Sequence, residues 1–399
     1  METIRLTSAA LRSFRFLAAL LTLAVCGQAA RADFFTTLNL VTDDQAANPA
    51  QTTDNHLKNA WGISFSPTSP FWVSSNGAGL STLYNVDPLT NVTTKQALEV
   101  VIPGDGSVTG QVFNGSSAFN GDRFLFVNED GTISGWRAAL GTNAEVLQTG
   151  FSTNVYKGTT LVTVGANTYL LSANFKSGNI DVLKSDSGAP NLTGNFTDPN
   201  LPSGFAPFNI QLLGDKLYVA YAKQGSGNDE QTGSGLGIVD VFDTQGNLIS
   251  RVASNGGPLN APWGLTIAPA SFGTLAGDLL VGNFGDGTIN AFDLATNSFV
   301  GQLAGSNGNP LVIDGLWGLT PGNGGSAGNA NTIYFSAGPG GESHGLFGAL
   351  LRNEVNSVPE PSTLILGLIA AGMFTAGWGL RYRAGTTQGV RESQPASIR

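Results

Sequence analysis

The sequence predicts an all-β protein built from a repeated unit of four short strands, flanked by two targeting segments. The chain of 399 residues holds 54 glycines and only 12% charged residues. This composition suits many tight turns and argues against a helix bundle or a disordered chain. A Trp-Gly motif recurs at Trp61, Trp263 and Trp317. Each copy opens a run of short strand patterns separated by turn residues, which is the main sign of an internal repeat.

The N-terminus has the pattern of a secretory signal peptide over residues 1–32. Arg12 and Arg15 precede the apolar run Phe16–Val25, and Ala30-Arg31-Ala32 then provides a small-x-small cleavage site before Asp33. A basic segment, an apolar segment and small residues in this order are typical of an exported protein. We therefore expect signal peptidase to cut between Ala32 and Asp33.

Cys26, the single cysteine of the chain, offers a second interpretation of this segment. It could be a lipidation site, although Val25 is larger than the residue that normally precedes such a cysteine. Cleavage after Ala32 would remove Cys26 with the signal peptide. The mature chain would then hold no disulfide and would depend on core packing or bound ions for its stability.

The C-terminus predicts a membrane-spanning sorting segment. Pro359-Glu360-Pro361 leads into the uncharged apolar stretch 364–380, which Arg381 and Arg383 follow. Seventeen apolar residues are just long enough to cross a bilayer, and the arginines would keep their end in the cytoplasm. An ordinary stop-transfer helix is the simpler alternative.

The order of these three parts resembles the PEP-CTERM sorting signal of Gram-negative bacteria, over Val358–Arg383. The resemblance implies recognition and cleavage by exosortase, an inner-membrane anchored precursor, and a final place at the cell surface or outside the cell. The cytoplasmic tail 384–399 is longer than such signals usually carry.

Between the two targeting segments, residues 33–357 predict a six-bladed β-propeller. Six similar units start near Trp61, Ser117, Thr159, Pro207, Trp263 and Trp317, at spacings of 42 to 56 residues. Four strands at this period are typical of a propeller blade. The last unit lacks a fourth strand, whereas Phe35–Val41 belongs to no complete unit. We expect Phe35–Val41 to close the last blade; a seven-bladed ring is the alternative.

The Trp-Gly motif together with the Pro-Glu-Pro tail resembles an uncharacterised family of secreted bacterial propellers with NHL-like repeats. The resemblance implies the fold and the export of the chain. It implies no activity, so function must be argued from a site.

Strand order places one candidate site at a channel mouth. The loops before the first strand and between the second and third strands of every blade fall on one face. His56, His344 and Glu129 lie in such loops and are the candidate catalytic residues. The candidate oxygen ligands of a calcium ion are Asn76, Asn128, Glu129, Asn174 and Asn283. The competing interpretation is that these asparagines only form turns.

Two functions of different class remain open. The net charge of −9 argues against a nucleic-acid partner, and the chain has no His-Glu-x-x-His motif. We favour a non-catalytic exported protein that binds an extracellular polysaccharide or an envelope protein. The alternative is a calcium-dependent hydrolase or lactonase at the channel mouth. The glycine-rich stretch Gly225–Gly235 is expected to be a solvated loop on the same face, and the repeated tryptophans to be packing residues rather than a sugar platform.

Overall fold

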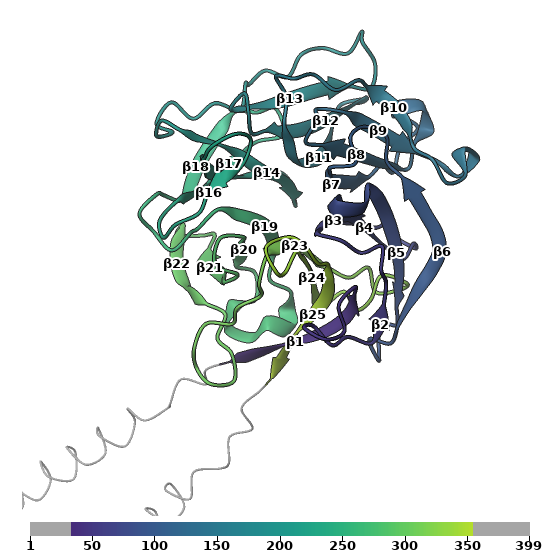
Figure 1. Cartoon of the computed structure of the whole chain (residues 1–399). Helices are drawn as coiled ribbons and strands as arrows, with labels where there is room; N and C mark the ends of the chain where they lie inside the picture. Colours follow the sequence, from purple (N-terminus) through teal and green to yellow (C-terminus); the bar gives the residue numbers. More distant parts are fainter. Residues whose placement is uncertain (1–32, 354–399) are drawn as a thin grey trace, which may run out of the picture. The chain divides into compact units, whose positions relative to one another are not determined.

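The protein is a ring of six β-sheets arranged as blades around an axis (Figure 1). The computed structural model describes residues 33–353. Helical structure in this part of the chain is confined to four short 3₁₀ segments: η1 (Asn76–Ala78), η2 (Phe119–Gly121), η3 (Ala138–Leu140) and η4 (Ala270–Leu275). The six-bladed all-β propeller predicted from the repeats is confirmed.

The targeting segments fall elsewhere. Residues 1–32, with the proposed signal peptide, and 358–399, with the sorting signal, its helix 364–380 and the tail, lie outside the described residues. Between residues 33 and 353 no helix is long and apolar enough to cross a membrane.

In blades 1 to 5 the strands follow one another in the chain, from the innermost at the axis to the outermost at the rim. Blade 1 holds β3 (Ala60–Ser64), β4 (Phe71–Ser75), β5 (Leu80–Val86) and β6 (Thr93–Val101). Blade 2 holds β7 (Val108–Phe113), β8 (Phe124–Asn128), β9 (Ile133–Trp136) and β10 (Glu145–Gln148). Blade 3 holds β11 (Tyr156–Val164), β12 (Asn167–Asn174) and β13 (Asn179–Lys184).

The second half of the ring is built in the same way. Blade 4 holds β14 (Phe205–Leu213), β15 (Lys216–Gln224), β17 (Gly237–Phe242) and β18 (Leu248–Ala253), with β16 (Glu230–Gln231) beside the end of β15. Blade 5 holds β19 (Pro262–Ile267), β20 (Leu279–Asn283), β21 (Ile289–Asp293) and β22 (Ser298–Gln302). Blade 6 holds β23 (Leu316–Pro321), β24 (Ile333–Ala337), β25 (Leu346–Asn353) and β1 (Phe34–Thr42), and β2 (Thr52–Thr53) lies parallel to β1.

The ring is closed by the N-terminal strand. In blade 6, β1 pairs antiparallel with β25, so that Phe34 lies opposite Asn353 and Thr42 opposite Leu346. Leu40 of this strand is fully buried. Because strands from both ends of the propeller share one sheet, the first and last blades are joined. The outer-strand closure predicted for Phe35–Val41 is confirmed.

Blade 3 differs from the four-stranded prediction, because it has three strands. The segment 185–204 that follows β13 contains Pro190, Pro199 and Pro202, and proline cannot donate to a strand ladder. This segment instead inserts Ala189 and Phe196 into the apolar seam between blades 3 and 4. The fourth strand is thus replaced by an irregular segment that fills a core.

Buried apolar side chains fill every seam between neighbouring blades, in six separate clusters. In the seam of blades 1 and 2, for example, Trp72 stacks on Phe124 with ring centroids 4.0 Å apart. A seventh cluster lies on the axis. All seven lie within residues 33–353, so the propeller carries its own core and should fold without its flanking segments.

Candidate functional site at the channel mouth

The channel mouth is the face where the loops before the innermost strands meet the loops between second and third strands. The antiparallel order of each blade brings these two sets of loops to the same face. Glu129 lies in the β8–β9 loop of blade 2, and Glu342 lies in the β24–β25 loop of blade 6. The long loop Gly225–Gly235 between β15 and β17, called the insertion below, reaches this face from blade 4.

Three tryptophans close the channel beneath the mouth. Trp61 stacks on Trp317 with ring centroids 3.5 Å apart, and Trp263 meets both rings edge-on at 6.1 and 6.0 Å. All three are at least 95% buried. The sequence predicts packing residues at these positions, and the structure places them on the axis rather than between blades.

Glycines let the innermost strands come close enough to fill the channel. A Cβ on Gly62 would lie 2.6 Å from the carbonyl oxygen of Thr109 in the next blade, and one on Gly264 would lie 2.7 Å from that of Trp317. Each innermost strand also carries a bulge where it pairs with the second strand. In the Trp-Gly motif, the tryptophan ring therefore lies on the axis, and the glycine that follows it occupies a position with no room for a side chain.

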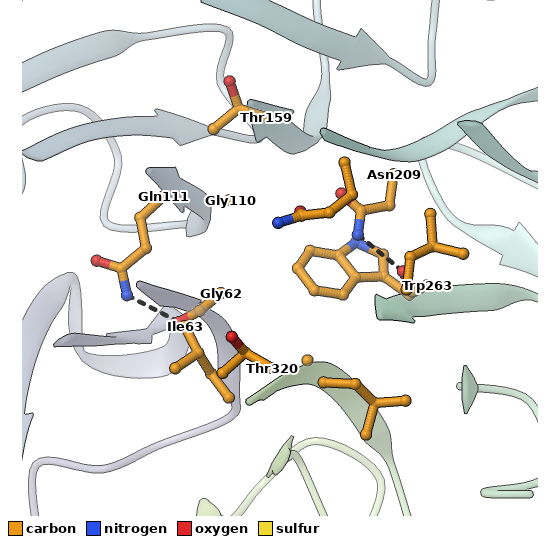
Figure 2. A pocket seen from close by; sticks show the side chains of 12 residues that line it. Gly62, Ile63, Gly110, Gln111, Thr159, Asn209, Trp263 and Thr320 are labelled. Carbon is orange, nitrogen blue, oxygen red and sulfur yellow. Dashed lines mark hydrogen bonds between the residues drawn. The ribbon is translucent and has the colours of Figure 1, made fainter. Parts of the chain in front are cut away.

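Below the tryptophans the channel holds a small cavity (Figure 2). Its volume is about 20 Å³, which is room for roughly one water molecule. Gln111 Nε2 donates to Gly62 O at 2.8 Å, and Asn209 Nδ2 donates to Trp263 O at 2.7 Å, so these amides bridge neighbouring blades. A ligand of ordinary size must therefore bind outside the channel.

A buried lysine stands at the centre of the mouth. Lys157 is 2% exposed, forms an ion pair with Glu129, and holds its Nζ 5.2 Å from the centroid of the Trp61 ring. Burial opposes the charged form, but the carboxylates of Glu129 and Glu230 outweigh it and raise the pKa of Lys157. The positive charge of Lys157 therefore offsets the negative charge of these carboxylates at the channel mouth.

Asparagines connect this ion pair to blade 6. Asn76 Nδ2 lies 3.4 Å from Glu129 Oε2, and Asn59 Nδ2 donates to Glu342 Oε2 at 2.7 Å. Asn59 Oδ1 accepts the indole N–H of Trp317 at 3.0 Å. Burial raises the pKa of Glu342, against the hydrogen bond from Asn59. The polar cluster and the tryptophan floor thus form one connected unit.

The insertion adds one inward carboxyl group to this cluster. Residues Gly225–Asp229 are exposed, whereas Glu230 turns inward where β16 pairs with the end of β15. Burial raises the pKa of Glu230 to about 7, although Lys157 acts in the opposite direction. Glu342 and Asp229 raise it further. Glu230 therefore gains or loses its proton near neutral pH.

An open cavity adjoins the cluster on the side of blades 2 and 3. Its volume is about 550 Å³, and it is called the mouth hollow below. Its walls include Asp105, Glu129, Phe151, Asn154, Lys176 and Asp229. This volume lies in the range of about 300–1,000 Å³ that is usual for ligand sites.

The structure brings together two of the five predicted calcium ligands, Asn76 and Glu129. The other three make hydrogen bonds within their own blades. Asn128 Nδ2 donates to Pro103 O at 3.0 Å, and Asn283 Nδ2 donates to Pro258 O at 3.1 Å, whereas the Oδ1 atoms of both are buried and accept no hydrogen bond from the described residues. Asn174 Oδ1 accepts the backbone N–H of Val155 at 3.1 Å. Each of these asparagines fixes the loop before the innermost strand of its blade.

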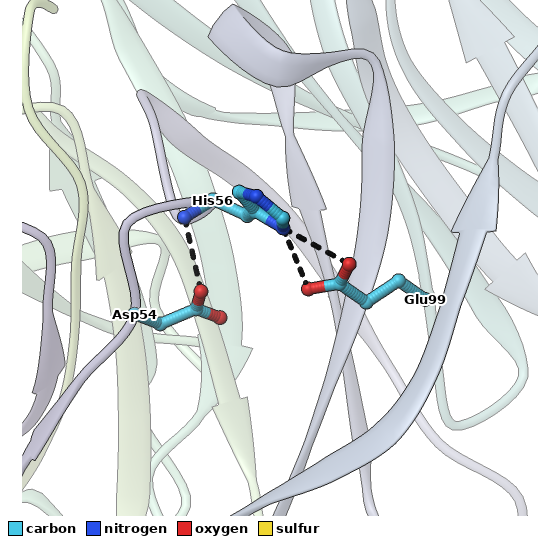
Figure 3. A group of neighbouring side chains, drawn as sticks. All are labelled: Asp54, His56 and Glu99. Atoms are coloured by element: carbon cyan, nitrogen blue, oxygen red, sulfur yellow. Dashed lines mark hydrogen bonds and ion pairs between the residues drawn. The ribbon is translucent and has the colours of Figure 1, made fainter.

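Both histidines lie near the seam of blades 6 and 1 and are held by carboxylates. His344 Nδ1 lies 3.0 Å from Asp43 Oδ2, and the same aspartate pairs with Lys58. His56 Nδ1 lies 2.9 Å from Glu99 Oε2 (Figure 3). The two rings thus bind different carboxylates, and neither is paired with Glu129.

Asp54, His56 and Glu99 approach one another closely enough to suggest a metal site. Figure 3 shows the three side chains converging from the loop before β3 and from β6. However, Lys95 Nζ lies 2.6 Å from Asp54 Oδ1 and 2.6 Å from Glu99 Oε1. A lysine ammonium therefore already occupies the position between the two carboxylates.

Lys157 is the residue of the mouth that sequence reasoning missed. A signal for it exists, because Lys157-Gly158 stands in blade 3 where Trp61-Gly62 stands in blade 1. At this repeat position blades 1, 5 and 6 carry an axial tryptophan, blade 2 carries Thr109 and blade 4 carries Phe208, so the charged side chain in blade 3 is a local exception. Departures from a local sequence pattern are expected at functional sites.

Comparison with known proteins agrees with the C-terminal prediction. Residues 357–384 match the family described as the PEP-CTERM protein-sorting motif, which confirms the signal predicted over Val358–Arg383. The uncharacterized protein R648 of Acanthamoeba polyphaga mimivirus is 31% identical over 329 residues, covering 77% of this chain and 78% of that protein. The uncharacterized protein L690 of the same virus is 36% identical over 211 residues, covering 51% and 53% of the two chains.

Solved structures with a similar arrangement include two enzymes. A streptogramin B lyase aligns over 80% of this chain and 98% of its own, with 13% identity and a TM-score of 0.45. The PQQ-bound aldose sugar dehydrogenase of Streptomyces coelicolor aligns over 81% and 100%, with 14% identity and a TM-score of 0.43.

Proposed function

The chain belongs to the same family as the mimivirus protein R648, and we propose that it is an exported, non-catalytic propeller that binds its ligand at the channel mouth. Its PEP-CTERM motif marks it for export and for processing by exosortase. We place the cut of signal peptidase between Ala32 and Asp33, and the anchor of the precursor in the helix 364–380. After processing, the propeller would act at the cell surface or outside the cell.

The observation that carries this proposal is a ligand-sized hollow beside a channel that is closed. The mouth hollow measures about 550 Å³, whereas the cavity in the channel measures about 20 Å³. A ligand can therefore lie on the mouth but cannot enter the ring. This geometry favours surface binding of an extended molecule over enclosure of a small substrate.

The polar groups of the mouth support binding more than catalysis. A general base needs to reach a nucleophile or an activated water. In the described part of the chain both histidine rings are paired with carboxylates away from Glu129. The ammonium of Lys157 neutralises Glu129 at the position where the hydrolase alternative would need a calcium ion.

The proposal is tested by measuring binding and turnover on the same sample. We expect the purified full chain in mild detergent to bind a polysaccharide or an envelope protein in calorimetric titrations. We expect no hydrolysis of a panel of lactones and esters, with or without added calcium. Turnover that depends on calcium and is lost in Glu129→Gln would replace the proposal with the hydrolase alternative.

A further inference from the structure

We propose that the mouth hollow is a saccharide-binding cleft in which the ring of Phe151 stacks against a sugar. The surrounding carboxylates and amides would hydrogen-bond to the hydroxyl or amino groups of that sugar. The inference rests on the proposed function, because it names the class of ligand that the same face binds.

Phe151 is an exposed aromatic ring on a loop that is held in place. Its side chain is 56% exposed at the wall of the mouth hollow. The backbone N–H of Asn154 donates to Phe151 O at 2.8 Å. Gly131 (φ +83°) of the β8–β9 turn packs closely beneath, since a Cβ there would lie 3.0 Å from Phe151 N. A fixed apolar surface beside a polar cavity is typical of a binding site.

Polar groups around this ring are free to bind. Asn228, Asp229 and Lys176 line the hollow, and their side chains make no hydrogen bond or ion pair with other described residues. Asp130 is oriented by its neighbours, since it accepts the N–H of Asp105 at 3.0 Å and that of Thr132 at 2.8 Å. Carboxylate oxygens keep further acceptor positions for sugar hydroxyls. An apolar plane edged by such acceptors suits a sugar ring, which has an apolar face and polar edges.

The charge of the mouth hollow determines which saccharides can bind there. Four carboxylates line the hollow, those of Asp105, Glu129, Asp130 and Asp229. Lys157 neutralises Glu129, and Lys176 is the one ammonium in the lining, so the lining keeps an excess of negative charge. Like charges placed across an interface oppose binding. The ligand should therefore carry hydroxyl or amino groups, and sugars with carboxylate or sulfate groups should be excluded.

The shape of the site indicates a chain of sugars rather than one ring. A second cavity of about 400 Å³ shares Asp130 and Ser152 with the mouth hollow. It extends to Val146 of β10, which is 51% exposed in the outermost strand of blade 2. The two cavities therefore adjoin at Asp130 and Ser152, and the second lies toward the rim.

The test is a calorimetric titration of the full chain with chitosan, neutral glucan and alginate oligomers. We expect the amino and neutral oligomers to bind and alginate not to bind. Phe151→Ala should weaken binding by about tenfold or more, as for a central aromatic contact. The control Phe299→Ala removes a ring that is 47% exposed on β22 and should leave the dissociation constant unchanged.

A second pair of variants tests the charge preference. Asp229→Lys should weaken chitosan binding more than glucan binding. Asp215→Lys changes an exposed carboxylate in the β14–β15 turn on the opposite face and should change neither.

The outcomes separate the two proposals. If the oligomers bind the wild type and Phe151→Ala equally well, or if alginate binds best, the saccharide cleft is wrong and the binding function stands. If the chain binds an envelope protein instead of saccharides, the saccharide cleft is likewise wrong and the binding function stands. If it binds neither saccharide nor envelope protein, the proposed function itself fails.

Discussion

Replacing Glu230 by glutamine should stabilise the protein at alkaline pH and leave it nearly unchanged at acid pH. The pKa of this carboxyl group rises from its ordinary value of 4.5 to about 7 in the folded chain, because burial disfavours the charged form. A group with a raised pKa holds its proton more tightly when folded. Its contribution to stability is therefore present below about pH 4.5 and is lost as the pH rises to about 7.

The size of the effect follows from the difference between the two pKa values. About 2.5 pKa units at 1.36 kcal/mol per unit give roughly 3 kcal/mol of destabilisation in the wild type above pH 8. Glutamine carries no charge, so Glu230→Gln should regain this free energy, as a rise of about 6 °C in melting midpoint. At pH 4.5 the difference should be under about 0.5 kcal/mol, because the carboxyl group is then protonated in the folded state and half protonated in the unfolded state.

The assay is a set of thermal melts of the wild type and Glu230→Gln at pH 4.5 and 8.5. The matched control is Asp215→Asn, which changes an exposed carboxylate in the β14–β15 turn on the opposite face. The difference between this variant and the wild type should be the same at both pH values. An offset between wild type and Glu230→Gln that does not depend on pH would refute the buried position of this carboxyl group.

Three further changes test the mouth and the closure of the ring. Lys157→Met should lower the free energy of unfolding by about 3–5 kcal/mol, because it leaves buried carboxylates unpaired; a loss no larger than that of the exposed control Lys216→Met, measured by denaturant unfolding, would contradict this role. Leu40→Ala should lower the free energy of unfolding by about 2–5 kcal/mol in the same assay if β1 closes blade 6. Thr37→Ala, on the exposed side of β1, should lower it little. Melts with calcium and with chelator should superimpose, since a specific ion at about a hundred times its dissociation constant would add roughly 2.7 kcal/mol; a clear upward shift with calcium would count against the lysine-neutralised mouth.

Much of the ring could be predicted because each blade repeats the same local pattern. The Trp-Gly motif and the alternating strand patterns repeat at a regular interval. The predicted strand Phe35–Val41 agrees with β1 because the last unit visibly lacks a strand. Blade 3 departs from the pattern where Pro190, Pro199 and Pro202 interrupt the place of a fourth strand. Those prolines could have indicated the departure in advance.

The site was harder to predict because it depends on contacts between blades. The turn asparagines Asn128 and Asn283 resemble ion ligands in the sequence, and in the structure their amide nitrogens hold the loops of their own blades. Lys157 meets Glu129 only because blades 2 and 3 pack side by side. Glu230 looks solvated within a glycine-rich loop, and its inward position follows from the pairing of β16 with β15. Neither contact corresponds to a repeated pattern in the sequence.

The most direct test of the central claim, that the channel mouth binds the ligand, is amide hydrogen exchange with and without a saturating amino-sugar oligomer. This measurement reports where backbone amides become protected. We expect slower exchange in the loops 103–107 and 149–155 and in the insertion, with no change in the turns of the opposite face. Protection confined to the opposite face or to the rim of blades 4 and 5 would contradict the account.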